Sequence, residues 1–532
     1  MKSTRFNINL FNLLGKANVD PDKHAFTFVN TDLSDERITY QDMYENSNRL
    51  ANILRKNGVG KGDTFVLLMR NHPEFIYALT AATTIGAIAV PIDPRYKGGK
   101  LEFIIKNSKA KCALVMDEFL DAILEILPDI KDLKIIAAGY KGHHNVPVNP
   151  DYPVLADLLA EASSDPPDGF IANDPSLPCQ IIFTSGTTGD PKGVVLKGDR
   201  LWIYGMMGGV VWKYQPDDIL YTGLSLTHGN AQAVTVFPAI AKEIPAVLSE
   251  KFTKSKIWDI CRKYACTSFS LLGGMMSGIY NEPPKPDDAD NPVRVVISAG
   301  TPRAIWEDFE KRFNVNIHEW YGAVEGGLAH NPPGFAPVGS FGKPLEMFME
   351  MKVVDENDNE CPPGVQGELI SRMKQGKTEV TYLGKDEESK EKTRGGWLRL
   401  GDICHTDENG NFYFDYRRGT ELRRHGDFIQ PDYVEKVIGE HPDISEVCVY
   451  GIPAETGAPG ESDLVAAVML FPGKKLDVES IRKACKKQLE ANSIPSYIQL
   501  VQDMPKSSSE KILDRELKDK FSPDAENVFR LA

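Results

Sequence analysis

Residues 184–194 read TSGTTGDPKGV and directly follow the apolar run CQIIF at residues 179–183. Gly186 and Gly189 let backbone N–H groups turn toward an anion, and Lys192 adds a positive charge. Four hydroxyl side chains add neutral hydrogen-bond donors: Thr184, Ser185, Thr187 and Thr188. A plain surface loop does not need this combination, and the stretch therefore predicts a loop that handles phosphate.

A Walker A loop is the main alternative for such a stretch. That motif reads G-x-x-x-x-G-K-[ST] and opens a helix. Here Asp190 and Pro191 separate Gly189 from Lys192, and the chain continues as the apolar run VVL at residues 194–196, which is typical of a second strand. The order of residues predicts a loop that caps a hairpin.

Length and charge limit the class of protein. A chain of 532 residues exceeds the size at which single cores stop growing, so we expect at least two domains. Lys and Arg total 61 against 75 Asp and Glu, a net charge of −14 that disfavours an extended nucleic-acid surface. Local positive groups must then hold any small anionic ligand.

Cysteine usage and hydropathy indicate the cellular environment. The eight cysteines are scattered, without a C-x-x-C pair or a Cys/His metal spacing, and are expected to be reduced and mostly buried. The sequence contains no apolar stretch of about 18 residues, and its N-terminus lacks a cleavage-site pattern. These features predict a soluble, cytoplasmic protein.

Hydrophobic periodicity predicts the fold class. Residues 39–57 carry apolar positions at helical spacing, KGDTFVLLM at 61–69 is strand-like, residues 73–85 are helical, and GAIAVPIDP at 86–94 reads as strand and turn. Strands that alternate with helices over this length indicate α/β layers with largely parallel sheets.

A change in composition predicts the domain boundary. After a strand-rich stretch at residues 338–416, YRRGTELRRHGDFIQPDYVEKVIGEHP at 416–442 is charged, punctuated by glycine and then helical. We expect an N-terminal domain over residues 1–418 and a small α+β C-terminal domain over 419–532.

The string at residues 184–194 resembles the signature of the adenylate-forming superfamily, which comprises acyl-CoA synthetases, peptide-synthetase adenylation domains and firefly luciferases. The resemblance spans nearly the whole chain, from about Thr39 to Arg515. It implies a large N-terminal domain of layered α/β subdomains with a small β-subdomain, and a small mobile C-terminal domain. It also implies that Thr184, Lys192 and the loop between them bind ATP.

Three further motifs resemble nucleotide-contacting segments of this superfamily. WYGAVEGG at 320–327 resembles Y-G-x-T-E, which implies that Tyr321 stacks on adenine and Glu325 helps hold Mg²⁺; Val324 replaces the usual Thr. VVISAGTP at 295–302 resembles the loop along adenine and the acyl group, which implies that role for Gly300. In GGWLRLGDICHTDENGNFYF at 395–414, Asp402 matches the Asp that binds both ribose hydroxyls.

The resemblance continues into the C-terminal region. Arg417 matches an Arg that contacts ribose, and Gly426 matches the glycine of the thiol tunnel. Gly419 matches the hinge position, where relatives usually have Lys or Asp. MPKSSSEKILDREL at 504–517 resembles P-K-T-x-x-G-K-x-x-R. Lys511 is then the lysine that bridges the acyl carboxylate and the α-phosphate, with Glu510 in place of a Gly.

The acyl site is implied by two other segments. His228 in SLTHGNAQ at 225–232 matches a loop His beside the acyl group, although a structural His is the alternative interpretation. KFTKSKIWDICRKYACTSFSLLGG at 251–274 is similar to carnitine-type, bile-acid-type and medium-chain or ring acyl-CoA ligases. Gly273 and Gly274 would give such a pocket a roomy wall.

The resemblance implies an AMP-forming acid–thiol ligase that uses ATP, Mg²⁺ and CoA as a monomer or homodimer. Its acid would be medium-chain, alicyclic or aromatic, or carnitine-like. Two alternatives stay open: an adenylation enzyme that loads a carrier protein, and an ATP- and acyl-binding homologue without activity. Retained Lys511, Glu325 and Asp402 argue against the latter, while Val324, Leu400 and Glu510 motivate it.

Overall fold

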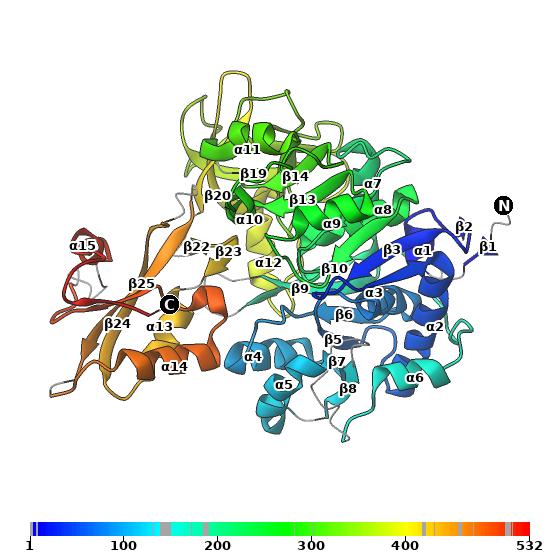
Figure 1. Ribbon diagram of the computed structural model, residues 1–532, viewed down its shortest axis with the longest axis horizontal. Helices are drawn as coiled ribbons and strands as arrows, with labels where there is room; N and C mark the ends of the chain where they lie inside the picture. The colour runs from blue at the N-terminus through cyan, green and yellow to red at the C-terminus, as the bar shows by residue number, and fades with distance from the viewer. Residues whose placement is uncertain are drawn as a thin grey trace.

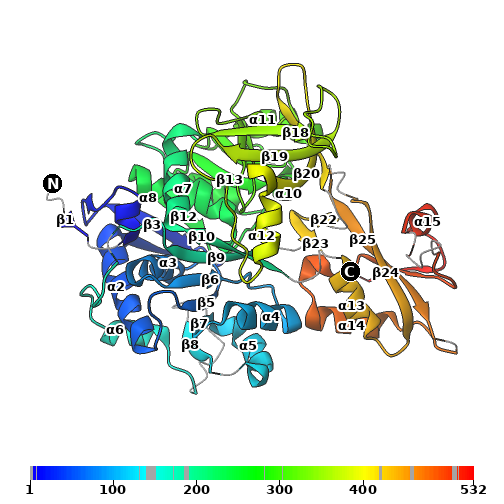
Figure 2. The same cartoon turned by 180° about the vertical axis from the view of Figure 1, so that it is seen from behind.

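The computed structural model describes residues 4–6, 9–130, 132–138, 151–171, 173–184, 191–280, 282–301, 303–417, 422–429, 431–455, 460–471, 473–505, 512 and 514–531. Within these residues the strands form two large sheets, two four-stranded sheets and two short two-stranded ones. Figures 1 and 2 show the C-terminal elements as a separate group beside the large body formed by the rest of the chain.

The first large sheet contains the hairpin that the sequence predicts. Its spatial order is β10 (Lys192–Lys197), β9 (Pro178–Thr184), β6 (Ile88–Pro91), β5 (Thr64–Leu68), β7 (Cys112–Met116) and β8 (Lys134–Ala138). All neighbours are parallel except β9 and β10, which are antiparallel with Lys192 opposite Thr184. The prediction of a hairpin at this point is confirmed.

The helices of this region include the two that the sequence predicts over residues 39–57 and 73–85. They are α2 (Tyr40–Lys56), α3 (Pro73–Ile85), α4 (Gly98–Ser108), α5 (Leu120–Ile126) and α6 (Leu155–Glu161). Thr39 and Asp42 form a reciprocal capping box that starts α2. Pro73 starts α3, and Gly86, at a φ of +68°, ends it in the left-handed conformation that glycine adopts without steric cost.

The second large sheet carries most of the site. Its order is β17 (Lys343–Pro344), β16 (Leu328–Asn331), β15 (Asn316–Gly322), β14 (Val295–Ala299), β13 (Ser268–Leu272), β11 (Leu220–Thr222), β12 (Ala246–Ser249), β3 (His24–Val29) and β4 (Asp35–Thr39). The strands from β15 to β3 run parallel, so the carboxyl ends of β13, β14 and β15 meet at one edge. Ligands of open α/β sheets bind at such an edge.

The helices around this sheet are α1 (Asn9–Leu13), α7 (Gly198–Val210), α8 (Phe237–Lys242), α9 (Ile257–Tyr264), α10 (Gly273–Tyr280) and α11 (Trp306–Phe313), with a π-helical turn at Ala231–Val236. Short 3₁₀ turns occur at Asp117–Phe119, Leu127–Asp129, Arg303–Ile305, Arg394–Gly396 and Ala491–Ser493. Two short strands, β1 (Thr4–Arg5) and β2 (Asn18–Val19), pair near the N-terminus.

The remaining sheets are smaller. β18 (Met349–Val354), β19 (Gly367–Met373), β20 (Leu398–Thr406) and β21 (Phe412–Arg417) form an antiparallel sheet near α12 (Asp386–Lys392). The C-terminal part has the hairpin β22 (Leu422–Arg424) and β23 (Asp427–Ile429) and the sheet β24 (Ile444–Pro453), β25 (Ser462–Leu470), β26 (Tyr497–Leu500) and β27 (Val528–Arg530). Its helices are α13 (Pro431–Gly439), α14 (Val478–Gln488) and α15 (Asp514–Asp519).

The predicted mixed α/β class, with a large N-terminal and a small C-terminal part, is confirmed. All eight cysteines are free and buried, as the scattered pattern predicts. Among the described residues, no helix is both long and apolar enough to span a bilayer. The boundary between residues 418 and 419 falls where residues are not described and stays a prediction.

Candidate active site

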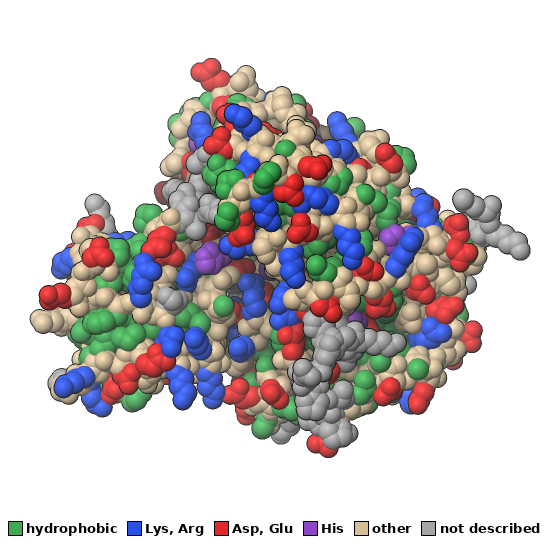
Figure 3. Space-filling view, viewed as in Figure 1, with side chains coloured by type: hydrophobic (Ala, Val, Ile, Leu, Met, Phe, Trp, Pro, Cys, Tyr) green, Lys and Arg blue, Asp and Glu red, His purple; other side chains and the backbone are tan. Residues whose placement is uncertain are grey.

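A cavity of about 370 Å³ lies between the carboxyl edge of the nine-stranded sheet and the β22–β23 hairpin. Its wall brings together residues from six segments that the sequence analysis singled out separately: Thr184, His228, Gly300, Tyr321, Glu325, Asp402 and Gly426. Lys and Arg side chains border the junction between the C-terminal group and the rest of the molecule (Figure 3). A wall of this composition suits a ligand that combines a ring, polar hydroxyls and anionic groups.

Tyr321 and Asp402 form one side of this cavity. The Tyr321 hydroxyl donates a hydrogen bond to Oδ2 of Asp402, and the Tyr321 ring stacks on Phe341 with centroids 4.8 Å apart. Asp402 pairs with Arg417 in the β20–β21 register. Because Asp402 is buried and lies beside the ring, one surface offers both a flat aromatic face and a carboxylate acceptor.

Tyr382 lies between Lys192 and Glu325 and contacts both. The Tyr382 hydroxyl donates to Oε1 of Glu325 at 2.9 Å, and Nζ of Lys192 lies 5.6 Å from the centre of the Tyr382 ring. Lys192 also pairs with Glu388 at 2.8 Å. No sequence signal pointed to Tyr382, which reaches the site because it bridges to Val194 of the hairpin.

The loop that carries Val324 and Glu325 is supported from α7. Arg200 donates through Nη1 to the carbonyl oxygen of Val324 at 3.3 Å and through Nη2 to that of Glu325 at 3.1 Å. The guanidinium thereby holds the backbone at the position where the sequence lacks the usual Thr. Sequence reasoning did not single out Arg200.

Glu319 lies beneath Gly300, and the sequence motifs did not identify it as a site residue. Its carboxylate accepts from the backbone N–H of Gly300 at 2.6 Å and from the hydroxyl of Thr301 at 2.6 Å. Burial raises the pKa of Glu319 to about 7, although these hydrogen bonds and the charge of Arg423 oppose the rise. Gly300 has a φ of +77°, and a Cβ there would lie 2.8 Å from a guanidinium nitrogen of Arg423, so the position favours glycine.

A second cavity of about 630 Å³ adjoins the first. The two share wall residues that include His228, Gly229, Leu272, Ala299 and Val324. The larger cavity continues past mostly apolar and aromatic side chains, among them Tyr204, Met207, Trp320, Leu345 and Met349. The two cavities therefore adjoin at this shared wall.

The glycines predicted to line this pocket, Gly273 and Gly274, are the first two residues of α10. Leu272, immediately before them, lines both cavities, while Gly273 is buried and is not among the described lining residues. Their role as a pocket wall stays a prediction.

His228 and Gly426 face the site from opposite parts of the molecule. Nε2 of His228 lies 3.7 Å from Oδ2 of Asp93. Gly426, at a φ of +84°, forms the turn of the β22–β23 hairpin, and its N–H donates to Oε1 of Glu461 at 3.0 Å. The hairpin turn therefore points its backbone at the same cavity that His228 lines.

Several predicted residues lie outside the described part of the chain: Ser185, Gly186, Thr187, Thr188, Gly419 and Lys511. The side chain of Arg417 is likewise not described. No group of three or more His, Cys, Asp or Glu side chains placed to hold a metal occurs among the described residues. A single carboxylate, that of Glu325, fits Mg²⁺, which takes most of its ligands from phosphate and water oxygens.

The layered sheets, the two adjoining cavities and the separate C-terminal group define a mixed α/β protein with a large N-terminal and a small C-terminal part. The family described as AMP-binding enzyme matches residues 14–376, and the AMP-binding enzyme C-terminal domain matches residues 433–511. The chain belongs to the AMP-binding enzyme family. The resemblance inferred from the motifs is thereby confirmed.

Individual relatives cover nearly the whole chain. A crotonobetaine/carnitine–CoA ligase of Salmonella heidelberg is 28% identical over 519 residues, covering 94% of this chain and 97% of the relative. A double mutant of o-succinylbenzoate CoA synthetase from Bacillus subtilis, bound with a product analogue, has a TM-score of 0.80 at 22% identity and 99% coverage of both chains. The same synthetase with its acyl-adenylate has a TM-score of 0.65 at 22% identity, covering 98% of this chain and 99% of that one.

Proposed function

We propose that this chain is an AMP-forming carboxylate–CoA ligase, which converts ATP, a carboxylic acid and CoA into acyl-CoA, AMP and pyrophosphate through an acyl-adenylate. The observation that carries the proposal is the shared wall of the two cavities at His228, Ala299 and Val324. A nucleotide in the smaller cavity and an acid in the larger one would meet there.

The first half-reaction activates the acid. A carboxylate is ionised at pH 7 and is a poor acyl donor until its oxygen becomes part of a good leaving group. Tyr321 would stack on adenine, Asp402 and Arg417 would bind ribose, and the backbone at Gly300 would follow the base. The loop at residues 184–188, Lys192 and Lys511 would offset charge on the phosphates as the α-phosphate is attacked. Bound beside Glu325, Mg²⁺ would supply further positive charge.

The second half-reaction transfers the acyl group to the CoA thiol. We assign the thiol path to the hairpin turn at Gly426, because this backbone lines the cavity. A change of backbone angles at Gly419 would then exchange Lys511 for Gly426, with residues 419–532 moving against 1–418.

The larger cavity favours a bulky acid. Its volume of about 630 Å³ and its apolar and aromatic lining suit a medium-chain, alicyclic or aromatic acid. The rings of Tyr204 and Trp320 would also suit a carnitine-like acid, since a quaternary ammonium is attracted to aromatic faces.

The test is mass-spectrometric detection of acyl-CoA and AMP with ATP, Mg²⁺ and CoA across short, medium, branched, alicyclic, aromatic and carnitine-like acids. Thioester formation with one class establishes the ligase and names its acid. Adenylate without thioester assigns the chain to carrier loading instead, and the absence of both products with every acid refutes the proposed activity.

A further inference from the structure

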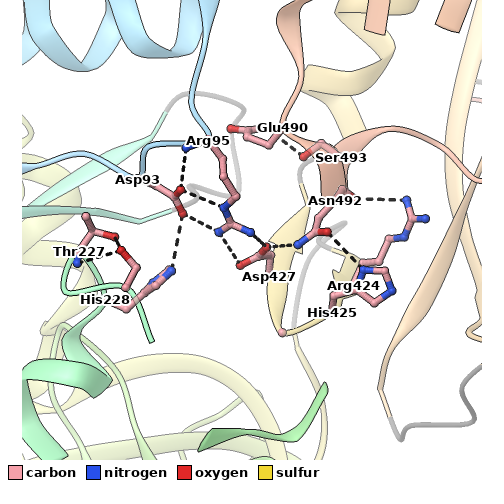
Figure 4. A network of polar contacts seen from close by, with 12 residues as sticks. Asp93, Arg95, Thr227, His228, Arg424, His425, Asp427, Glu490, Asn492 and Ser493 are labelled. Atoms are coloured by element: carbon pink, nitrogen blue, oxygen red, sulfur yellow. Dashed lines mark hydrogen bonds and ion pairs between the residues drawn. The ribbon is translucent and has the colours of Figure 1, made fainter. Parts of the chain in front are cut away.

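We propose that Arg95 is a positioning residue, which latches the β22–β23 hairpin to the N-terminal part of the molecule in the arrangement that forms the thioester. The inference rests on the proposed function and adds to it the contact that selects between the two half-reactions. It is built on a chain of polar contacts that runs from the C-terminal hairpin to His228 (Figure 4).

One guanidinium joins two carboxylates from distant parts of the sequence. Nε of Arg95 donates to Oδ1 of Asp93 at 2.9 Å, and Nη1 donates to Oδ2 of Asp427 at 2.6 Å. Nη2 donates to both carboxylates, so each pair is bidentate. Bidentate pairs between Arg and carboxylate fix orientation as well as distance, which suits a contact that sets the position of a hairpin.

The pair between Arg95 and Asp93 lies within the N-terminal part and can stay in place when the hairpin moves. Asp93 is buried, and although burial opposes its ionisation, the hydrogen bonds and charge of Arg95 lower the pKa of Asp93 to about 2. If the hairpin moves away, Arg95 keeps Asp93 as its partner, and no buried charge is left unpaired. Asp427 is the more exposed of the two carboxylates and can return to water.

Other contacts make the latch specific for one placement of the C-terminal part. Nδ2 of Asn492 donates to Asp427, and Nδ1 of His425 lies 3.3 Å from Oδ1 of Asn492. Lys100, at the start of α4, pairs with Glu490 at 2.7 Å, and both side chains are largely buried. The segment from Glu490 to Asn492 therefore docks together with the hairpin.

The latch also reaches the site. Oδ2 of Asp93, which accepts from Arg95, lies 3.7 Å from Nε2 of His228. Asp427 directly follows Gly426, whose backbone lines the smaller cavity. The contact made by Arg95 thus fixes both sides of the path that the thiol would take.

The principal test separates the two half-reactions. Asp427→Asn leaves the pair between Arg95 and Asp93 intact, and we expect it to slow conversion of supplied acyl-adenylate to thioester by about tenfold or more. Pyrophosphate exchange, which reports adenylation, should stay within about twofold of wild type. Arg95→Gln removes the contact with Asp427 and also the partner of buried Asp93, so it should slow the thioester step at least as much, and adding Asp427→Asn to Arg95→Gln should slow this step little further.

The chain offers a matched control. Lys487 and Glu125 also pair between the C-terminal and N-terminal parts, at 3.1 Å, but their side chains are 68% and 53% exposed. Lys487→Gln should leave both half-reactions unchanged. Equal loss of both half-reactions in Asp427→Asn would mean that this carboxylate merely supports the fold, and no loss in either would remove the latch from the mechanism.

Hydrogen exchange of the peptide over residues 422–429 gives a readout that does not depend on CoA. Exchange should be faster in Asp427→Asn than in wild type and unchanged in Lys487→Gln. If wild type forms adenylate but no thioester, the proposed ligase activity fails, and this exchange alone decides the latch. Equal exchange in Asp427→Asn and wild type would then overturn it.

Discussion

The wall of the smaller cavity and the junction with the C-terminal part are held together by different kinds of contact. In the wall, Tyr321 bonds to Asp402 and Tyr382 to Glu325, all within residues 1–418. At the junction, Arg95 pairs with Asp427 across 332 sequence positions and Lys100 with Glu490 across 390. These two wall contacts therefore form within one part of the chain, although the β22–β23 hairpin completes the wall, and the contacts of the junction exist only when two parts meet.

This difference matches the demands of a reaction in two stages. Contacts between charged groups set partner orientation and can exchange for water when the parts separate. Hydrogen bonds in a buried wall have no such alternative, because an unpaired polar group there is costly. A nucleotide site that stays fixed while a second surface is exchanged needs contacts between charged groups at the junction and buried hydrogen bonds in the wall.

The sharpest way to test this contrast is Lys511→Ala. Because Lys511 is assigned to the adenylation arrangement alone, its loss should lower pyrophosphate exchange by about 10²-fold or more. Thioester formation from supplied acyl-adenylate should change little. Rapid-quench assays of the separate half-reactions measure both rates, and equal losses would contradict a C-terminal part that presents different faces in turn.

Asp402→Asn tests the fixed wall with a smaller expected effect. The amide keeps the shape of the side chain but replaces one acceptor oxygen with a donor, so the KM for ATP should rise by about 10- to 100-fold. Both half-reactions should suffer, since AMP stays bound through the second. Glu408→Gln, at an exposed turn after β20, is the control and should leave the KM unchanged. An unchanged KM in Asp402→Asn would remove ribose binding from this residue.

Glu319 makes the wall sensitive to pH. Its pKa is raised to about 7 by burial, so the folded protein holds this proton over a range in which the unfolded chain has lost it. The contribution of Glu319 to the free energy of unfolding is therefore fully present below the pKa that this residue has in the unfolded chain. The contribution declines by on the order of 3 kcal/mol as the pH rises to about 7. Glu319→Gln should remove this decline.

Chemical denaturation at pH 5 and pH 8 measures the effect. The stability of Glu319→Gln minus that of wild type, both measured as the free energy of unfolding, should be larger at pH 8 than at pH 5. Parallel behaviour of the two proteins between these values would show that Glu319 is ionised in the folded state.

The sequence predicted the parts of the site that depend on local pattern. The hairpin of β9 and β10 followed from the order of residues between Gly189 and Lys192, and α3 from its periodicity. Tyr321 and Asp402 were identified by motif and share one cavity. In each instance, the deciding information lies within a few residues.

Partners brought together by tertiary structure could not be predicted in this way. Tyr382 reaches Glu325 from 57 positions away, and nothing around it in the sequence distinguishes it from another tyrosine outside the strands. Arg95 follows an Asp-Pro turn, so its local contact with Asp93 is ordinary turn chemistry, while its second partner is 332 positions away. Charges at a domain junction carry no periodic signal, because their pairing depends on how complete domains dock.

Tyr382→Phe offers the finest test of the wall. The substitution keeps the ring beside Lys192 and removes only the hydroxyl that donates to Glu325 at 2.9 Å. Loss of one hydrogen bond to a charged group costs about 1–2 kcal/mol, so adenylation should slow by about 5- to 30-fold, with the requirement for Mg²⁺ shifted to higher concentration.

Tyr413→Phe, which removes a hydroxyl that donates to the turn carboxylate of Asp407, is the matched control and should leave the rate unchanged. If Tyr382→Phe slows the thioester step alone, Glu325 is held for the junction and not for the nucleotide. A loss confined to adenylation, with its magnesium dependence altered, places the Tyr382 hydroxyl with the fixed wall, because only that half-reaction needs the metal beside Glu325.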